Sequence, residues 1–264
     1  MGTQDSQEVD RGVSTLAETF RWFTDAANYS GTGSIPVRVI EHVQLSSQSV
    51  LLAALLALPV GLYVGHKKRF EFAAITVGNI GRAIPSFGLI AVLFVPTSSW
   101  PGDLGYWAVF IAMVLLAIPP ILINTSVGIR NVDQETVEAA RGMGMTGRDV
   151  LWRIEIPLAI PLIVTGLRTA SVQVIATATL GAITSIGGIG RFIYDGFATG
   201  SKEEVLGGAI LVAILAILTE VTFSLLERAL TPRTSSEHRQ RFRSSDSETG
   251  PPDTQSGSAG FASA

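Results

Sequence analysis

Two long stretches without a charged side chain set the strongest constraint on what this chain can fold into. Residues 43–65 and 106–128 contain no Asp, Glu, Lys or Arg. A helix needs about 20 mainly apolar residues to cross the hydrocarbon core of a bilayer. Charged residues make up only 16% of the 264 residues, against about a quarter in soluble domains. We therefore predict an all-α integral membrane protein.

Apolar stretches of sufficient length occur at several places along the chain. The stretch from 156 to 190 is longer than one perpendicular span needs, so we interpret residues 156–165 as a lead-in to the fourth span. We predict about five transmembrane helices, at residues 43–65, 72–95, 106–128, 166–186 and 205–226.

The distribution of Lys and Arg predicts how these spans are oriented. Basic residues gather after the first and third spans and at the start of the C-terminal segment, and the alternate loops carry few. Because basic loops stay in the cytoplasm, we expect the N-terminus outside and the C-terminus in the cytosol. Residues 1–42 are then an extracytoplasmic segment, in which 16–27 either lie flat at the outer interface or form a loose tail. Residues 231–264, rich in Ser, Gly, Pro and charge, are expected to be a disordered cytosolic tail.

The cytosolic loop over residues 130–157 has the pattern of an ordered element. Asp133 is suited to cap a helix over 134–141, because a carboxylate before the first turn accepts unpaired backbone N–H groups. Three glycines, Gly144 among them, then interrupt this helix. The small side chains before them allow another protein to approach closely.

A second short helix is predicted to follow the glycines. Thr146 and Asp149 have the spacing of a capping box. Pro157 is expected to end this helix and to begin the next, because its ring disfavours a helical residue before it. The loop is thus predicted to consist of two short helices that meet at a glycine corner.

The spacing of these residues resembles the EAA signature of binding-protein-dependent ABC importer permeases. In that family Glu-Ala-Ala is followed after three residues by Gly, and after nine more by Ile, one residue and Leu-Pro. Ile156 stands where the family usually has Leu, and every other fixed position matches. The matching residues, to which the resemblance assigns coupling with an ATPase, are Glu138, Ala139, Ala140, Gly144, Ile154 and Pro157.

This resemblance implies a MetI-like fold whose transmembrane permease domain covers residues 43–230. The loop over 130–157 would be a coupling helix that seats in a groove of a cytosolic ATPase. The implied partners are two ABC ATPase subunits that bind ATP and Mg, a second permease copy or paralogue, and an extracytoplasmic solute-binding protein. The chain itself would be a non-catalytic subunit without a cofactor, in a bacterial plasma membrane.

Further segments are similar to the osmoprotectant branch of these permeases. The segments are Arg38–His42, Ile84–Ser86, Gly166–Ala170 and Gly187–Gly190. Members of that branch import glycine betaine, carnitine, choline or similar compatible solutes. The resemblance therefore implies such a solute for this chain.

Three charged residues fall inside predicted spans, where an unpaired charge costs several kcal/mol. They are Arg82, Arg168 and Glu220. In one interpretation, each charged side chain extends to the membrane interface or forms an internal ion pair, with Glu220 neutralising one of the arginines. In the other, an arginine meets the carboxylate of a zwitterionic solute in transit. Pro85 can kink the second span and free carbonyls that line a pathway.

Other classes of protein fit the sequence less well. Cysteine is absent, the three histidines are scattered, and no phosphate-binding G-x-x-x-x-G-K-[ST] loop is present. A net charge of −3 without a basic patch gives no indication of nucleic-acid binding. An ABC permease for an amino acid or methionine-like solute stays open. An ion-coupled secondary transporter fits poorly, because it favours two similar halves with acidic residues in mid-membrane.

Overall fold

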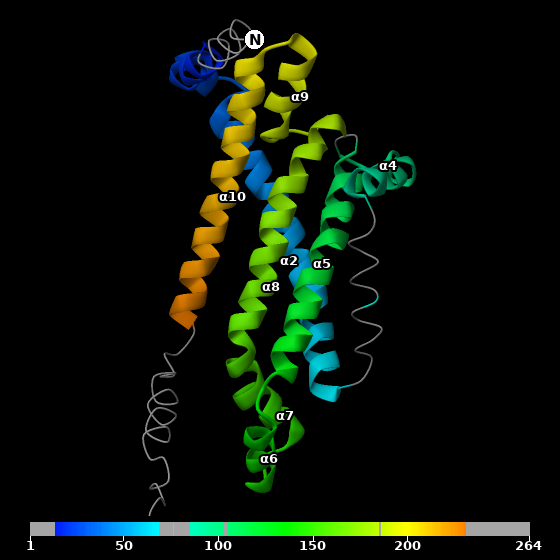
Figure 1. The fold of residues 1–264 in the computed structure, drawn as a ribbon. Helices are drawn as coiled ribbons and strands as arrows, with labels where there is room; N and C mark the ends of the chain where they lie inside the picture. Colours follow the sequence, from blue (N-terminus) through cyan, green and yellow to red (C-terminus); the bar gives the residue numbers. More distant parts are fainter. Residues whose placement is uncertain (1–13, 69–75, 77–84, 103–104, 185, 231–264) are drawn as a thin grey trace, which may run out of the picture. The chain divides into compact units, whose positions relative to one another are not determined.

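The computed structural model describes residues 14–68, 76, 85–102, 105–184 and 186–230, and within these ranges the chain forms helices and no strands. Long helices run side by side along most of the molecule (Figure 1). They are α2 (Ile35–Lys67), α5 (Tyr106–Arg130), α8 (Ile156–Ala178) and α10 (Lys202–Leu230). Among the described residues, four helical stretches that contain these elements are long and apolar enough to cross a membrane. The all-α membrane fold predicted from the sequence is confirmed.

Three of the predicted spans lie within α2, α5 and α10; α2 and α10 extend past the predicted bounds at both ends, and α5 only at its C-terminal end. The later part of the second predicted span forms a short apolar helix, α4 (Ser86–Thr97). Of its earlier part, residues 72–75 and 77–84, with Arg82, lie outside the described residues. Pro85 does not kink a helix here but is the N-cap residue of α4.

Residues 156–165, interpreted as a lead-in to the fourth span, form the first turns of α8 and continue directly into the rest of that helix. Gly166, where the fourth span was expected to begin, lies inside this helix. A Cβ added there would lie 2.8 Å from the Cβ of Asn124 and 3.0 Å from the carbonyl oxygen of Pro120. The absence of a side chain at Gly166 therefore allows α8 to pack closely on α5.

Small residues also bring α2 and α5 into close contact. A Cβ at Gly61 would lie 2.8 Å from the Cβ of Thr125, and one at Gly65 would lie 2.8 Å from the Cβ of Ile129. Membrane helices associate through such close contacts because lipid supplies no hydrophobic driving force between them. The two backbones approach where a larger side chain would hold them apart.

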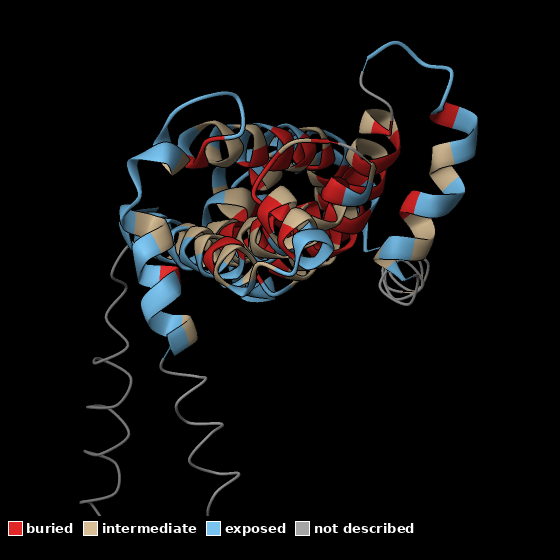
Figure 2. Ribbon diagram, turned by 90° about the horizontal axis from the view of Figure 1, so that it is seen from above, coloured by how far each residue is buried: buried red, intermediate tan, exposed pale blue. Residues whose placement is uncertain are grey.

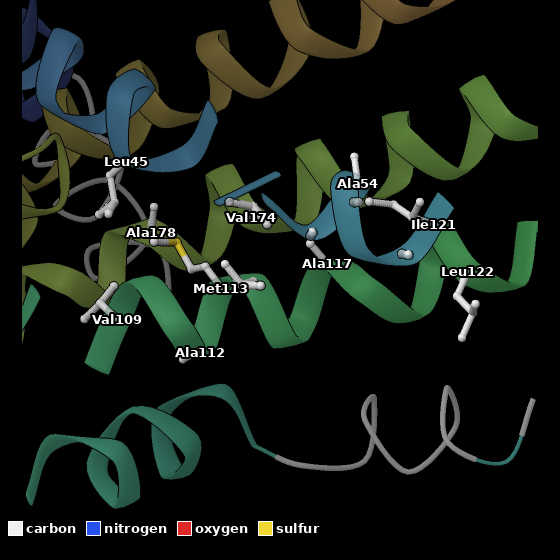
Figure 3. Packing of buried hydrophobic residues seen from close by; sticks show 14 of the residues in the cluster. Leu45, Ala54, Val109, Ala112, Met113, Ala117, Ile121, Leu122, Val174 and Ala178 are labelled. Carbon is white, nitrogen blue, oxygen red and sulfur yellow. The ribbon is translucent and has the colours of Figure 1, made fainter. Parts of the chain in front are cut away.

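The main core lies where α2, α5 and α8 meet. Figure 2 shows the buried residues gathered in the middle of the helix bundle, and Figure 3 shows side chains such as Met113, Ile121 and Val174 between the helices. These three are completely or almost completely buried, with alanines such as Ala117 between them. The core is therefore built from small and medium apolar residues at close helix crossings.

The end of the bundle away from the loop over residues 130–157 carries shorter elements. A 3-10 turn, η3 (Thr179–Thr184), follows α8, and α9 (Gly190–Thr199) leads into α10. A helix over residues 14–24 and the turn η1 (Ala26–Tyr29) precede α2. Along α10 most apolar side chains are exposed, as expected of a helix that faces lipid or another subunit.

Candidate coupling site

Two short helices, α6 (Gln134–Gly142) and α7 (Gly147–Val150), form the loop at one end of the bundle (Figure 1). The carboxylate of Asp133 caps α6 by accepting the backbone N–H two residues on at 3.2 Å. Thr146 and Asp149 cap α7 reciprocally, with backbone N–H bonds of 3.2 and 3.3 Å to the partner's side chain. The hydrogen bond from the Thr146 hydroxyl lowers the pKa of the Asp149 carboxyl, which favours its ionised, capping form. Both predicted caps are confirmed.

Gly144 ends α6 in a backbone conformation that glycine adopts without strain. Its φ is +87°, in the left-handed region that costs other residues roughly 1–2 kcal/mol. The N–H of Gly144 donates to the carbonyl of Arg141 at 2.9 Å, and that of Met145 donates to the carbonyl of Ala140 at 3.2 Å. This pair of bonds is the Schellman motif, which satisfies carbonyls at a helix C-terminus. The fixed spacing from Ala140 to Gly144 is therefore the spacing of a helix stop.

The loop has a small hydrophobic core of its own. Its buried residues are Val132, Val137, Ala140 and Val150, with Met145 and Ile154 packed against them. Glu138 and Ala139 lie on the exposed face of α6, and Met143 is 78% exposed at its end. The two alanines of the signature thus differ, because Ala140 holds the loop together and Ala139 is available to a partner.

The connection from this loop to α8 differs from the prediction that Pro157 ends a helix. Residues Leu151–Glu155 form a π-helical turn that continues directly into α8. In a regular α-helix the ring of Pro157 would clash with the carbonyl of Arg153. Arg153 lies in the π-helical turn, which is wider than an α-helical turn because its bonds run from residue i to i+5. The chain therefore stays helical from the loop into the membrane span.

Two contacts join the loop to the end of α2. The Nδ1 of His66 donates to Glu155 Oε2 at 2.6 Å, and both side chains are largely buried. The Lys68 ammonium donates to the side-chain carbonyl of Gln134. These residues were missed from the sequence, because each pair is far apart along the chain. The contacts fix the loop to α2 as well as to α8, so a force on the loop reaches both helices.

The structure brings two of the intramembrane charges together. Arg168 Nη1 on α8 lies 3.4 Å from Glu220 Oε1 and 3.5 Å from Glu227 Oε2, both on α10. Glu227 carries no sequence signal that would have paired it with Arg168. The arrangement favours an internal charge cluster that joins α8 to α10.

Removing the carboxylates from this cluster tests its role in stability. We expect Glu220→Gln to lower the free energy of unfolding by less than about 1 kcal/mol, because Glu227 still faces Arg168. The double variant with Glu227→Gln leaves the arginine uncompensated and should cost roughly 2.5–3.5 kcal/mol. Chemical denaturation in detergent measures both, with Glu135→Gln in the exposed loop as the control. Equal losses in the single and double variants would contradict this assignment.

At the other end of the bundle, two segments singled out in the sequence meet. Glu41 on α2 accepts the backbone N–H of Gly188 at 2.7 Å and a hydrogen bond from Arg38 at 3.0 Å. The neighbouring His42, almost fully buried, donates from Nε2 to the carbonyl of Ile175 on α8 at 3.0 Å. Helix α2 therefore holds the turn between α8 and α9 from one side.

Glycines make the turn between α8 and α9, here called the outer turn, possible. Gly188 has a φ of +94°. A Cβ at Gly187 would lie 1.9 Å from Glu41 Oε2, and one at Gly190 would lie 2.2 Å from the carbonyl oxygen of Thr179. The chain therefore turns at 187–190, and the turn is closed by contacts that admit no side chain at Gly187 or Gly190.

A groove of about 450 Å³ lies between α2, α8 and α10. It carries no charged residue, and its few polar groups are hydroxyls such as those of Ser46 and Ser171. Within the described part of the chain, no group of three or more His, Cys, Asp or Glu is placed to hold a metal ion. The groove offers no charge partner for a zwitterion.

Comparison with known proteins identifies the family and the relatives of this chain. The family described as binding-protein-dependent transport system inner membrane component matches residues 29–236. Carnitine transport permease protein OpuCD of Listeria monocytogenes is 39% identical over 192 residues, which cover 72% of this chain and 84% of that protein. Glycine betaine/carnitine/choline transport system permease protein OpuCB of Bacillus subtilis is 34% identical over 201 residues, covering 76% and 90%.

Solved structures share the fold. A MetNI methionine ABC transporter in an inward-facing conformation superposes with a TM-score of 0.66 at 22% identity, over 74% of this chain and 95% of that one. An amino acid ABC transporter with histidines superposes with a TM-score of 0.60 at 19% identity, over 73% and 92%. With the family match over most of its length, the chain belongs to the binding-protein-dependent transport system inner membrane components.

Proposed function

We propose that this chain is the membrane-spanning permease subunit of an ATP-binding-cassette importer for a compatible solute such as glycine betaine, choline or carnitine. The observation that carries the proposal is the loop with its own core, its exposed Glu138 and Ala139, and its contacts to α2 and α8. Relatives named for the transport of carnitine, choline and glycine betaine support the solute class. The resemblances to methionine and amino acid transporters extend to the fold alone.

ATP and Mg are proposed to bind to two separate cytosolic ATPase subunits, because the sequence lacks the loop that grips nucleotide phosphates. Each ATPase would receive the exposed face of α6 in a groove. Closure of the ATPases would then move α6, and the hydrogen bond between His66 and Glu155 would carry the displacement into α2 and α8. The chain itself catalyses no reaction in this scheme.

A second permease, identical or a paralogue, is proposed to complete the pathway. The charge-free groove and the exposed apolar length of α10 support this, because the groove offers a zwitterion no charged side chain and α10 leaves apolar surface for a partner to cover. An extracytoplasmic binding protein would deliver the solute to the end that carries α9. The coupling loop would face the cytosol of a bacterial plasma membrane, in agreement with its basic residues.

Solute uptake in cells tests the proposal. The chain is produced with its ATPase and binding protein in a bacterial strain without its own osmoprotectant uptake, and radiolabelled glycine betaine, choline, carnitine and methionine are supplied. We expect uptake of at least one of the first three and none of methionine, and loss of uptake when ATP is depleted. Uptake that survives ATP depletion would overturn the importer, and uptake of methionine alone would overturn the solute class.

A further inference from the structure

A helix over residues 14–24 precedes the part of the chain that matches the family, which begins at residue 29. Trp22 fixes this helix to the bundle. Its ring meets that of Phe192 on α9 edge to face, with centroids 5.2 Å apart. A Cβ at Gly207 on α10 would lie 2.5 Å from the Trp22 ring. The helix is thus seated on both α9 and α10, at a position where α10 has no side chain.

The surface of this helix is divided into three parts. Thr19 is buried and Trp22 packs on the bundle. Leu16 and Phe20 are 64% and 70% exposed, and their spacing of four residues places them on one face. The charged side chains, Glu18 among them, lie on the opposite side by helical periodicity. One helix therefore presents separate surfaces to protein, to an apolar medium and to water.

The position of Trp22 along α10 indicates which apolar medium covers the exposed face. The first turn of α10 carries Glu203 and Glu204, and no further charge occurs before Glu220. Gly207 is three residues past Glu204, or about 4.5 Å along the helix axis. Trp22 therefore lies where the polar start of α10 gives way to its apolar length. Tryptophan is enriched at this depth in membrane proteins.

The helix also borders an exposed part of the bundle surface that contains apolar side chains. A pocket beside the helix is lined by Thr15 together with Phe197 of α9 and Leu206 of α10. Phe197 is 74% exposed. Apolar side chains of α9 and α10 are therefore exposed beside the helix, on the side where a bilayer around α10 would lie.

We propose that residues 14–24 form an interfacial anchor that binds the lipid surface at the end of the bundle opposite the coupling loop. Leu16 and Phe20 insert among the acyl chains, the charged side faces water, and Trp22 ties α9 and α10 to the membrane surface. An amphipathic helix with a charged side and with Phe and Leu on another side has the composition of such anchors. The proposal does not depend on which solute is transported.

Site-directed spin labelling tests the anchor directly, because the chain contains no cysteine. Single variants Leu16→Cys, Phe20→Cys, Glu18→Cys and Arg21→Cys of the full-length chain are labelled and reconstituted in liposomes. Collision rates with oxygen, which concentrates in lipid, and with a water-soluble nickel chelate are then measured. We expect labels at 16 and 20 to collide mainly with oxygen, and labels at 18 and 21 mainly with nickel.

Two results would overturn the proposal. Nickel access at all four positions would place the helix in water. Labels at 16 and 20 that are shielded from both reagents would indicate a protein partner, either a second copy or the binding protein. As a further control, Gly207→Val in the Phe20→Cys background fills the space on α10 against which the Trp22 ring packs. The oxygen-to-nickel ratio should then fall severalfold, and an unchanged ratio would contradict the role of Trp22 in the anchor.

Discussion

Replacing Ala139 by arginine is expected to abolish ATP-driven uptake while the coupling loop stays folded. Ala139 lies on the exposed face of α6, so a long charged side chain meets no neighbour within the loop. It would instead prevent close approach of the ATPase surface. Losing such a central contact costs about 2 kcal/mol or more, so ATPase association should weaken roughly 30-fold or more.

Matched variants separate docking from folding. Ala139→Ser keeps the side chain small and should retain both association and uptake. Ala140→Arg should instead unfold the loop, because Ala140 is only 2% exposed in its core. Copurification of the ATPase in mild detergent measures association, and limited proteolysis of the loop measures folding. Normal association of the Ala139→Arg variant would refute the proposed coupling face.

A single methyl group at Gly190 is expected to have a large effect at the opposite end of the molecule. The added Cβ of Gly190→Ala would lie 2.2 Å from the carbonyl oxygen of Thr179 and 2.8 Å from its Cα. Both neighbours are backbone atoms, so the clash is relieved only by moving η3 away from α9. Overpacking of this kind costs typically 1–3 kcal/mol, and sometimes more.

The control for this substitution is Gly33→Ala, in the turn before α2. A Cβ at Gly33 meets nothing within 4 Å, and its φ is not in the left-handed region. We expect a thermal midpoint in detergent close to that of the unmodified chain for Gly33→Ala, and a midpoint lower by several degrees for Gly190→Ala. Equal midpoints would show that the outer turn tolerates displacement.

Features that depend on neighbours along the chain could be predicted from the sequence. The caps at Asp133 and Thr146 and the helix stop at Gly144 each need only residues within one or two turns. The apolar stretches likewise gave the membrane-length helices, because a span is a property of one segment.

Features that depend on distant residues could not be predicted. His66 and Glu155 are 89 residues apart, and Glu41 and Gly188 are 147 apart. A side chain's own segment does not indicate such a partner. The role of Gly166 in packing against Asn124 and Pro120 was not predicted for the same reason.

The glycine contacts between α2 and α5 bear on how such a subunit changes shape. At Gly61 and Gly65, which lie against Thr125 and Ile129, α2 has no flexible side chain that could take up a displacement. We therefore expect them to shift as one rigid body. Along α10 only Gly207 and Gly208 are buried. Relative sliding that opens and closes a passage should then occur between α10 and the other helices.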